Sequence, residues 1–395
     1  MEEWKTYKLS EIGTVVGGAT PSTKVAENYD GDIPWITPKD LSNFSGRFIE
    51  HGERNITQQG FDSCSCQMLP KDSVLFSSRA PIGYVAIAAV PLCTNQGFKS
   101  VIPNEKIVDP RFLYYLLKFN KERIAEMGSG TTFMEVSGGV MKNVEVCLPE
   151  LTVQKRAAEI LSSIDDKIEL NNRINHNLEE QAQALYKSWF VDFEPFKDGK
   201  FIDSEFGMIP DGWRILSFED FTDLSNERVD SETIPEFSIT NNGIFPRDTK
   251  FNKQLSSSSL KNKVIRKGDL VFGMSREILN WGIMKEPIGG VSSAYTVYTV
   301  DKTLVTPQYL EFFIKNHLSY FKDLIKPAAR EGQGIDKTVL SSKLIILPNM
   351  DVWERFSLVL DVLIKERLHI TSELLELTIY RDELLPALIK GHITC

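Results

Sequence analysis

Two stretches of the chain carry apolar side chains at alternating steps of three and four residues. The first begins at Gln154 and ends at Trp189, and eight of its eleven positions are apolar. The same ladder shifted by 199 residues runs from Trp353 to Leu388, with nine apolar positions of eleven. A period of 3.5 residues is typical of a coiled-coil seam. We therefore expect two long helices, over residues 151–194 and 350–390, each roughly 50–60 Å long.

Three residues within these two stretches bear on how the helices pair and where they end. Asn171 and Asn175 occupy seam positions, where buried asparagines can set the register of two helices. Simple solvation of the two amides is the alternative. Pro386 is expected to break the second helix near its end, because proline lacks a backbone donor.

The remaining stretches show shorter periods. Segments such as VLFSS (74–78) and YVAIAAV (84–90) are β-rich and bounded by Gly, Pro and Ser. A helical pattern follows Pro110, and a hydrophobic strand then runs into the Leu-Pro pair at 148–149. Residues 1–150 and 205–349 are therefore each predicted to form a mixed α/β globule.

The two halves of the chain repeat each other in four blocks that follow the same order. WKTYKLSEI (4–12) is echoed by WRILSFEDF (213–221), and KDSVLFSSR (71–79) by KGDLVFGMSR (267–276). VDPRFLYYLLK (108–118) matches VTPQYLEFFIK (305–315), and the strand ending at Pro149 matches the one ending at Pro348. This self-similarity indicates a tandem duplication.

A duplicated chain has a simple way to bury two seams, which is to pair the helices with each other. If a pseudo-twofold axis relates the repeats, equivalent faces meet and the helices run antiparallel. The predicted fold is therefore α+β: two mixed α/β globules, each followed by a long helix, with the helices paired as an antiparallel coiled coil. This arrangement would place the globules at opposite ends of a rod.

Composition and charge narrow the function classes. With 395 residues and 42% hydrophobic content, the chain can bury more than one core. It has no apolar run long enough to cross a membrane, no signal-peptide pattern, and five cysteines without a CxxC pair. We therefore expect a cytoplasmic protein without a metal cluster. Its net charge is −9, yet residues 247–267 hold seven cations and one anion. This basic strip suits phosphate contacts, or is simply a solvated loop.

Sequence motifs for catalysis are missing. The chain has no phosphate-binding loop, no dinucleotide fingerprint, no zinc-protease or nucleophile-elbow motif, and no adenine-methyltransferase string. Its five histidines stand far apart. We therefore predict no catalytic residues, no metal ligands and no cofactor in this chain.

Several strings resemble the specificity subunits of type I restriction–modification enzymes. They are QAQALYKSWFVDFEPF (181–196), RDELLPALIKGHI (381–393), LPELTVQKRAAEILSSID (148–165) and SSRAPIGYVAI (77–87). The resemblance covers nearly the whole chain, and its helix motifs are more specific than those in the globules. It implies that each globule reads one half of a split site in double-stranded DNA, and that the helices act as a ruler. It also implies partners: two modification subunits that carry S-adenosylmethionine and methylate adenine, and translocating restriction subunits.

One departure from the family pattern bears on those partners. The entry to the first helix has Pro149 and Gln154, whereas the second repeat has Trp353 at the matching place. We therefore expect the surface on which partner subunits dock to differ between the repeats.

Candidate DNA-contacting residues are polar side chains that follow short apolar segments, where loops emerge. In the first globule they are Lys39, Arg79, Asn95, Gln96 and Lys99, and in the second Lys250, Lys253, Lys261, Lys263 and Arg276. The lysines suit phosphates better than bases, whereas amides such as those of Asn95 and Gln96 suit adenine. Two alternatives remain: an Asn-Gln-Gly string commonly forms a turn, and Arg79 and Arg276, at equivalent repeat positions, can support their loops.

Two other functions compete with DNA recognition. A scaffold that does not bind DNA would keep the helices but would show no salt-dependent DNA binding. A nuclease or methyltransferase of unknown type would be active as the purified chain alone.

Overall fold

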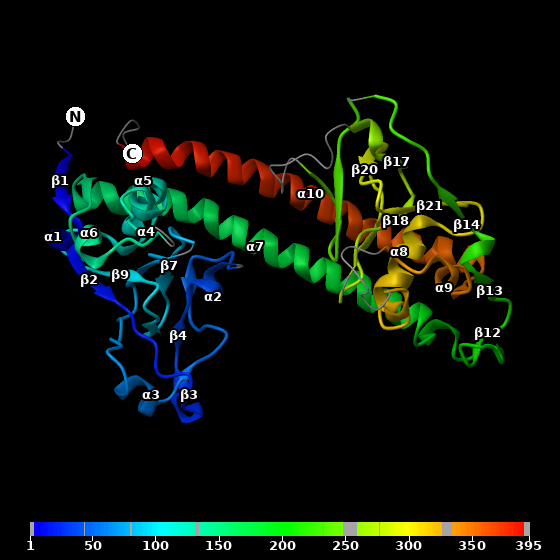
Figure 1. Ribbon diagram of the computed structural model, residues 1–395, viewed down its shortest axis with the longest axis horizontal. Coiled ribbons are helices and arrows are strands. Elements are labelled where there is room, and N and C mark those ends of the chain that lie inside the picture. Colours follow the sequence, from blue (N-terminus) through cyan, green and yellow to red (C-terminus); the bar gives the residue numbers. More distant parts are fainter. Residues whose placement is uncertain are drawn as a thin grey trace. The chain divides into compact units, whose positions relative to one another are not determined.

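The computed structural model describes residues 4–42, 44–79, 81–130, 134–231, 233–247, 259–275, 277–325 and 334–390. The chain forms two compact units (Figure 1). Unit 1 combines residues 1–176 with 367–395, and unit 2 comprises residues 177–366. Each unit thus contains a globule, part of one long helix and part of the other. The four-segment division by chain order stays a prediction.

Unit 1 is built around a five-stranded sheet in the order β2-β9-β6-β7-β5, antiparallel except for the β7–β5 pair. The strands are β2 (Gly13–Gly17), β9 (Lys99–Pro103), β6 (Val74–Phe76), β7 (Val85–Ala88) and β5 (Phe48–Ile49). Two smaller pairs join β1 (Lys5–Lys8) to β10 (Glu145–Leu148) and β4 (Trp35–Ile36) to β8 (Cys93–Thr94); β3 is Tyr29–Ile33. The short helices are α1 (Leu9–Ile12), α2 (Pro38–Ser42), α3 (Gln58–Asp62), α4 (Pro110–Phe119), α5 (Lys121–Glu126) and α6 (Gly138–Lys142).

Unit 2 contains an antiparallel sheet in the order β14-β21-β18-β19. Its strands are β14 (Thr222–Ser225), β21 (Thr296–Val300), β18 (Leu270–Phe272) and β19 (Trp281–Ile283). The smaller pairs are β11 (Phe201–Ile202) with β12 (Ile209–Pro210), β13 (Arg214–Ser217) with β22 (Leu344–Leu347), β15 (Phe237–Thr240) with β16 (Gly243–Pro246), and β17 (Lys263–Arg266) with β20 (Ile288–Val291). The short helices are α8 (Pro307–Asn316) and α9 (Lys337–Ser341).

The tandem duplication is confirmed by this topology. The order β2-β9-β6-β7 in unit 1 equals the order β14-β21-β18-β19 in unit 2. The β1–β10 pair corresponds to β13–β22, and α4 corresponds to α8. Both helices begin with proline after a capping side chain: Asp109 accepts from Arg111 N and Phe112 N, and Thr306 accepts from Tyr309 N. The mixed α+β fold class is therefore correct.

The two heptad ladders form helices α7 (Leu151–Phe190) and α10 (Met350–Ile389), each 40 residues long. In unit 1 they pair antiparallel, since Asp165 contacts Arg381, Asn171 contacts Glu373, and Asn175 contacts Thr371. In unit 2, Phe190 near the end of α7 packs on Trp353 near the start of α10. The predicted antiparallel pairing is thus confirmed within each unit.

Asn171 and Asn175 are not merely solvated. Asn171 is buried, and its Nδ2 donates to Glu373 Oε2 at 2.7 Å. Asn175 Nδ2 donates to Thr371 Oγ1 at 3.2 Å. Both hydrogen bonds join α7 to α10. Whether they set the register of the two helices stays a prediction.

The expected break at Pro386 is wrong. Helix α10 continues through it to Ile389. Proline removes one donor, but Leu385, Leu388 and Ile389 are buried in the core of unit 1. Their packing outweighs the local cost, because tertiary burial contributes more than the loss of one helical hydrogen bond.

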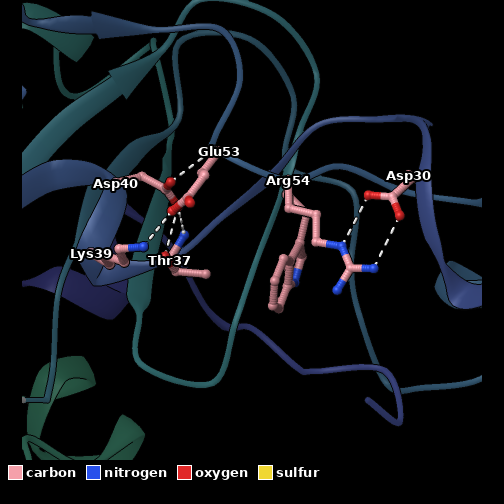
Figure 2. A pocket seen from close by; sticks show the side chains of 7 residues that line it. Asp30, Thr37, Lys39, Asp40, Glu53 and Arg54 are labelled. Atoms are coloured by element: carbon pink, nitrogen blue, oxygen red, sulfur yellow. Dashed lines mark hydrogen bonds and ion pairs between the residues drawn. The ribbon is translucent and has the colours of Figure 1, made fainter. Parts of the chain in front are cut away.

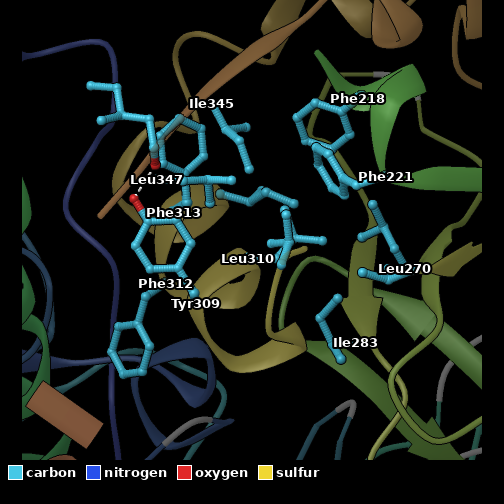
Figure 3. Close-up of a cluster of buried hydrophobic side chains, with 14 of the residues drawn as sticks. Phe218, Phe221, Leu270, Ile283, Tyr309, Leu310, Phe312, Phe313, Ile345 and Leu347 are labelled. Carbon is cyan, nitrogen blue, oxygen red and sulfur yellow. Dashed lines mark hydrogen bonds between the residues drawn. The ribbon is translucent and has the colours of Figure 1, made fainter. Parts of the chain in front are cut away.

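The core of unit 2 is rich in aromatic side chains (Figure 3). Phe218 and Phe221 lie beside the sheet residue Leu270, and Tyr309, Leu310, Phe312 and Phe313 come from α8. Ala182, Tyr186 and Phe190 at the end of α7 belong to the same cluster. In the described parts of the chain, no helix combines the length and the apolar content that spanning a membrane requires.

Candidate nucleic-acid interface

Two of the predicted residues in unit 1, Arg79 and Lys99, pair with one carboxylate, Glu135. Arg79 Nε lies 3.0 Å from Glu135 Oε2, and Lys99 Nζ lies 3.5 Å from Glu135 Oε1. Lys99 Nζ also lies 3.5 Å from the carbonyl oxygen of Gln96, which follows Asn95. The structure therefore brings Arg79, Asn95, Gln96 and Lys99 into one region, although they come from two loops and one strand.

The backbone explains why these segments converge. After β6 the chain stays extended, and Ser78 N donates to the Gly97 carbonyl at 2.7 Å. On the other side, Val136 N donates to the Ser78 carbonyl at 3.0 Å. Ser78 is fully buried between these two neighbours. The side chain of the next residue, Arg79, therefore emerges beside Glu135.

The charges in this cluster compensate one another. Burial alone would raise the pKa of the Glu135 carboxyl, but the Arg79 hydrogen bond and the charges of Arg79 and Lys99 outweigh it and lower that pKa. Glu135 is therefore ionised at neutral pH and neutralises much of the positive charge beside it. The side chain of Arg79 is about half exposed, whereas that of Lys99 is only 15% exposed. Arg79 is thus the better placed of the two to reach DNA.

The Asn-Gln-Gly string forms a turn. Asn95 Oδ1 accepts from Gly97 N at 2.9 Å, which occupies the amide oxygen within the loop. Gln96 is exposed, and its Oε1 accepts a hydrogen bond from the Thr20 hydroxyl. Of the two amides, Gln96 is therefore the more accessible, and a base contact by either one stays a prediction.

Gly18 is packed so closely against this loop that no side chain fits. A Cβ there would lie 2.2 Å from the carbonyl oxygens of Thr94 and Asn95. We expect Gly18→Ala to destabilise unit 1 by about 1–3 kcal/mol, because overpacking must move backbone rather than a flexible side chain.

Chemical denaturation of the purified chain measures this effect. Gly17→Ala is the matched control, since a Cβ at Gly17 meets only Lys99 Cδ, at 3.9 Å. Equal denaturation midpoints for the two variants would contradict the close packing of this loop.

Lys39 lies on α2 at the rim of an open pocket of about 430 Å³ (Figure 2). It pairs with Glu53 at 2.5 Å, and both side chains are largely exposed. On the other side of the pocket Arg54 forms a two-bonded pair with Asp30, at 3.0 Å for each bond. Asp40 accepts from Thr37 N and Glu53 N and so holds the loop. An exposed ion pair is weak, so Lys39 can exchange Glu53 for a phosphate at small cost.

Of the five residues predicted to contact DNA in the second globule, the structure describes two. Lys250, Lys253 and Arg276 lie outside the described residues. Lys261 is exposed, and its carbonyl accepts from Arg228. Lys263 is only 6% exposed, and its Nζ donates to the Tyr295 carbonyl at 2.8 Å. Burial lowers the pKa of Lys263, as expected for a structural lysine, so this side chain supports the β17 region from inside.

The basic strip is also less free than its sequence suggests. Arg266 makes two bonds to Glu227, at 2.6 and 2.7 Å. Arg247 Nη1 donates to Ser238 Oγ at 2.8 Å, with Glu236 at 4.0 Å from its Nε. Among the described cations of the strip, these arginines and Lys263 already have partners within the domain.

Glu135 is the residue that sequence reasoning missed. It is a lone acid in a glycine- and serine-rich stretch, and no motif marks it. Only the fold places it between Arg79 and Lys99.

Gln154, at the entry to α7, is buried. Its side chain accepts a hydrogen bond from Asp109 N and donates to the Ile107 and Pro149 carbonyls. Gln154 and Trp353 are both buried, so the difference between them lies in internal packing, and the expected difference in the docking surface stays a prediction.

The chain is similar in sequence to known DNA specificity proteins. Residues 1–180 match the type I restriction modification DNA specificity domain. Over 99% of its length the chain is 33% identical to the type I restriction enzyme MjaIX specificity subunit of Methanocaldococcus jannaschii, and it covers 94% of that protein. It is 30% identical to the type I restriction enzyme HindI specificity subunit of Haemophilus influenzae, over 50% of this chain and 43% of that one.

A solved structure shares the fold. The S subunit of a type I restriction–modification system from M. genitalium superposes with a TM-score of 0.55 at 15% identity, over 98% of this chain and 96% of that one. The two proteins therefore share this globule-and-helix fold. The chain belongs to the family of type I restriction enzyme specificity subunits.

Proposed function

We propose that each globule of this chain reads one half of a split, asymmetric site in double-stranded DNA. The observation that carries the proposal is the duplicated sheet with unlike loops. The loops before the equivalent strands β9 and β21 differ in their polar residues: Asn95 and Gln96 precede β9, whereas Ser292 and Ser293 precede β21. Base edges are read by such side chains, whereas phosphate contacts only position a protein. Two unlike readers joined in one chain give an asymmetric bipartite site and gain from effective concentration.

The chemistry belongs to partner subunits in this proposal. Two modification subunits carry S-adenosylmethionine and methylate adenine, and restriction subunits complete the nuclease. This chain supplies no catalytic residue and works in the cytoplasm. Support comes from the family membership and from the absence of catalytic motifs in the sequence.

Mapping of N6-methyladenine across the genome tests the proposal. Cells that carry the modification subunit are compared with and without the gene for this chain. We expect a bipartite methylated motif that depends on the gene. Absence of such a motif, with the modification subunit expressed and bound to the chain, would refute the proposed function.

The outer face of α10 supports partner docking. Leu358 and Val362, one turn apart on the unit 2 part of the helix, are 70% and 65% exposed. Both lie outside the seam. At the equivalent positions α7 carries Glu159 and Ser163. Exposed apolar side chains of this size on a helix mark protein contacts, and we propose a modification subunit as the occupant.

The double variant Leu358→Glu/Val362→Glu is expected to weaken association with the modification subunit by about 30-fold or more, as loss of an apolar hot spot of 2 kcal/mol implies. Binding of the variant chain to the purified modification subunit measures this. Leu358→Met/Val362→Ile, which keeps both positions apolar, is the control and should bind normally. Unchanged affinity of the double variant would exclude this face.

A further inference from the structure

A buried arginine in unit 1 attaches the recognition globule to helix α7. Arg47 precedes β5, the edge strand of the five-stranded sheet, and its side chain is only 5% exposed. Its Nε donates to Glu169 Oε1 at 2.9 Å, its Nη2 donates to Asp166, and its Nη1 lies 3.4 Å from the Ser162 carbonyl. The backbone N of Arg47 also donates to Glu169 Oε1, at 3.1 Å. One residue of the sheet edge therefore contacts two successive turns of α7.

A second buried group on α7 extends this network to two more helices. Asp165 is almost fully buried. Its Oδ2 accepts from the Tyr115 hydroxyl of α4 at 2.7 Å, and its Oδ1 lies 3.1 Å from Arg381 Nη1 of α10. The network therefore ties together the sheet edge, α4, α7 and α10, all within unit 1.

Both arginines keep their charge despite burial. Burial would lower the pKa of Arg47, but its hydrogen bond to Glu169 and the acidic side chains around it raise that pKa. The pKa of Arg381 is raised in the same way: the bonds to Asp382 and Asp165 outweigh burial. Burial and the Asp165 charge raise the pKa of Tyr115, so its hydroxyl remains a donor.

In unit 2, the equivalent contact between the globule and the long helices contains no charged side chains at these positions. The residues equivalent to Tyr115, Asp165 and Arg381 are Phe312, Ile364 and Ala182. All three belong to, or pack against, the hydrophobic core of unit 2. An apolar arrangement therefore holds a globule to these helices, and apolar replacements of buried ion pairs are often equally or more stable. Stability alone does not account for the ionic version in unit 1. Directional bonds differ from apolar contacts in permitting only one relative orientation.

The attachment of the globule has two points along α7. The first is apolar: Ala157, Ala158 and Leu161 pack in the same core as Phe112 and Tyr115 of α4. The second is the Arg47 contact with Ser162, Asp166 and Glu169, which begins one residue after Leu161 and reaches two turns further. With the apolar contact alone, the globule could rotate about that point on α7. A second, directional contact prevents this rotation.

We propose that Arg47 and Asp165 are positioning residues that fix the angle of the first recognition globule on its helix pair. They thereby restrict the number of base pairs that the enzyme accepts between its two half-sites. The inference rests on the proposed function, since the gap is defined only for a bipartite site.

The test copies the second repeat into the first. The triple variant Tyr115→Phe/Asp165→Ile/Arg381→Ala keeps an apolar contact and removes the bonds of Asp165, while the Arg47 bonds to Asp166 and Glu169 stay. The complex of the full chain with its modification subunits is assayed for methylation of DNAs in which both half-sites are constant and the gap differs by one or two base pairs. Wild type is expected to methylate one gap at least 100-fold faster than its neighbours. For the triple variant we expect the neighbouring gaps to rise to within tenfold of the preferred one, with unchanged half-site sequences.

Arg47→Met is the second variant, and it should broaden the accepted gap in the same direction. Lys106→Met, which removes an exposed cation of the same globule outside the predicted DNA-contacting set, is the matched control and should keep the wild-type gap. If the triple variant folds and shows the wild-type gap profile, the positioning role of Asp165 is wrong, and the same result for Arg47→Met excludes the role of Arg47. Failure of the wild-type complex to methylate any bipartite site would refute the proposed function instead, so the two failures are distinguishable.

Discussion

Replacement of Phe190 by alanine is expected to lower the free energy of unfolding of unit 2 by about 3–5 kcal/mol. Phe190 is 3% exposed at the end of α7. Its ring centroid lies 4.7 Å from that of Phe356, 5.5 Å from that of Tyr309 and 5.7 Å from that of Trp213. One side chain thus joins α7, α8, α10 and the segment before β13. Its loss removes apolar burial and several ring contacts, and leaves a cavity that the surrounding elements can fill only in part.

Urea unfolding followed by tryptophan fluorescence measures this effect, because four of the six tryptophans lie in unit 2: Trp189, Trp213, Trp281 and Trp353. The unit 2 transition is compared by its midpoint, since a chain with two units need not unfold in one step. Leu358→Ala, at an exposed position on α10, is the control and should change stability by no more than about 0.5 kcal/mol. A shift as small for Phe190→Ala as for this control would show that the aromatic cluster does not hold α7 to the globule.

The second large effect is expected on DNA affinity. Arg79→Ala should weaken binding to the specific site by about 1–3 kcal/mol if Arg79 reads a base. If it contacts a phosphate instead, affinity should fall uniformly across sequences, and the slope of log K against log salt should decrease by about 1. Either outcome follows from the geometry, because Arg79 is the more exposed of the two cations that Glu135 holds.

Glu135→Gln is the complementary variant. It removes the negative charge between Arg79 and Lys99 while keeping a similar side-chain shape. Affinity for nonspecific DNA is therefore expected to rise and its salt dependence to steepen. Titration of labelled duplexes at several salt concentrations measures both variants. If Arg79→Ala changes neither specific affinity nor salt slope, the Glu135 cluster is not part of the DNA interface, and Arg79 has only the loop-supporting role considered for it.

Local pattern was enough to predict the repeated architecture. The 3.5-residue ladders became α7 and α10, and the four repeated blocks became equivalent strands and helices in the two units. Such periodicity is readable because burial of one face of a helix imposes a regular spacing on the sequence. The break at Pro386 was predicted wrongly because that prediction considered only the local backbone. Proline's effect on the local backbone is visible in the sequence, but the burial of Leu385 and Leu388 that opposes it is not.

The site was less predictable than the fold. Arg79, Asn95, Gln96 and Lys99 do converge, but Asn95 uses its amide oxygen within the turn, and Lys99 is largely covered. Lys263 looked like a surface cation and is buried against the Tyr295 carbonyl. A lysine in sequence carries no sign of its exposure, because its long stem can pack in either setting.

The sequence by itself determined the two helices, from spacings within short segments, and the duplication, from blocks that recur in the same order. The antiparallel pairing followed from these once a pseudo-twofold axis was assumed. Only the tertiary structure decided which charges are compensated and which residues attach the first globule to its helices. Arg47 and Asp165 are separated by more than a hundred residues, and Glu135 lies far along the chain from Arg79. Their partners are set by how the chain folds back on itself, and the strength of a charge contact depends on distance and burial, neither of which a linear pattern contains.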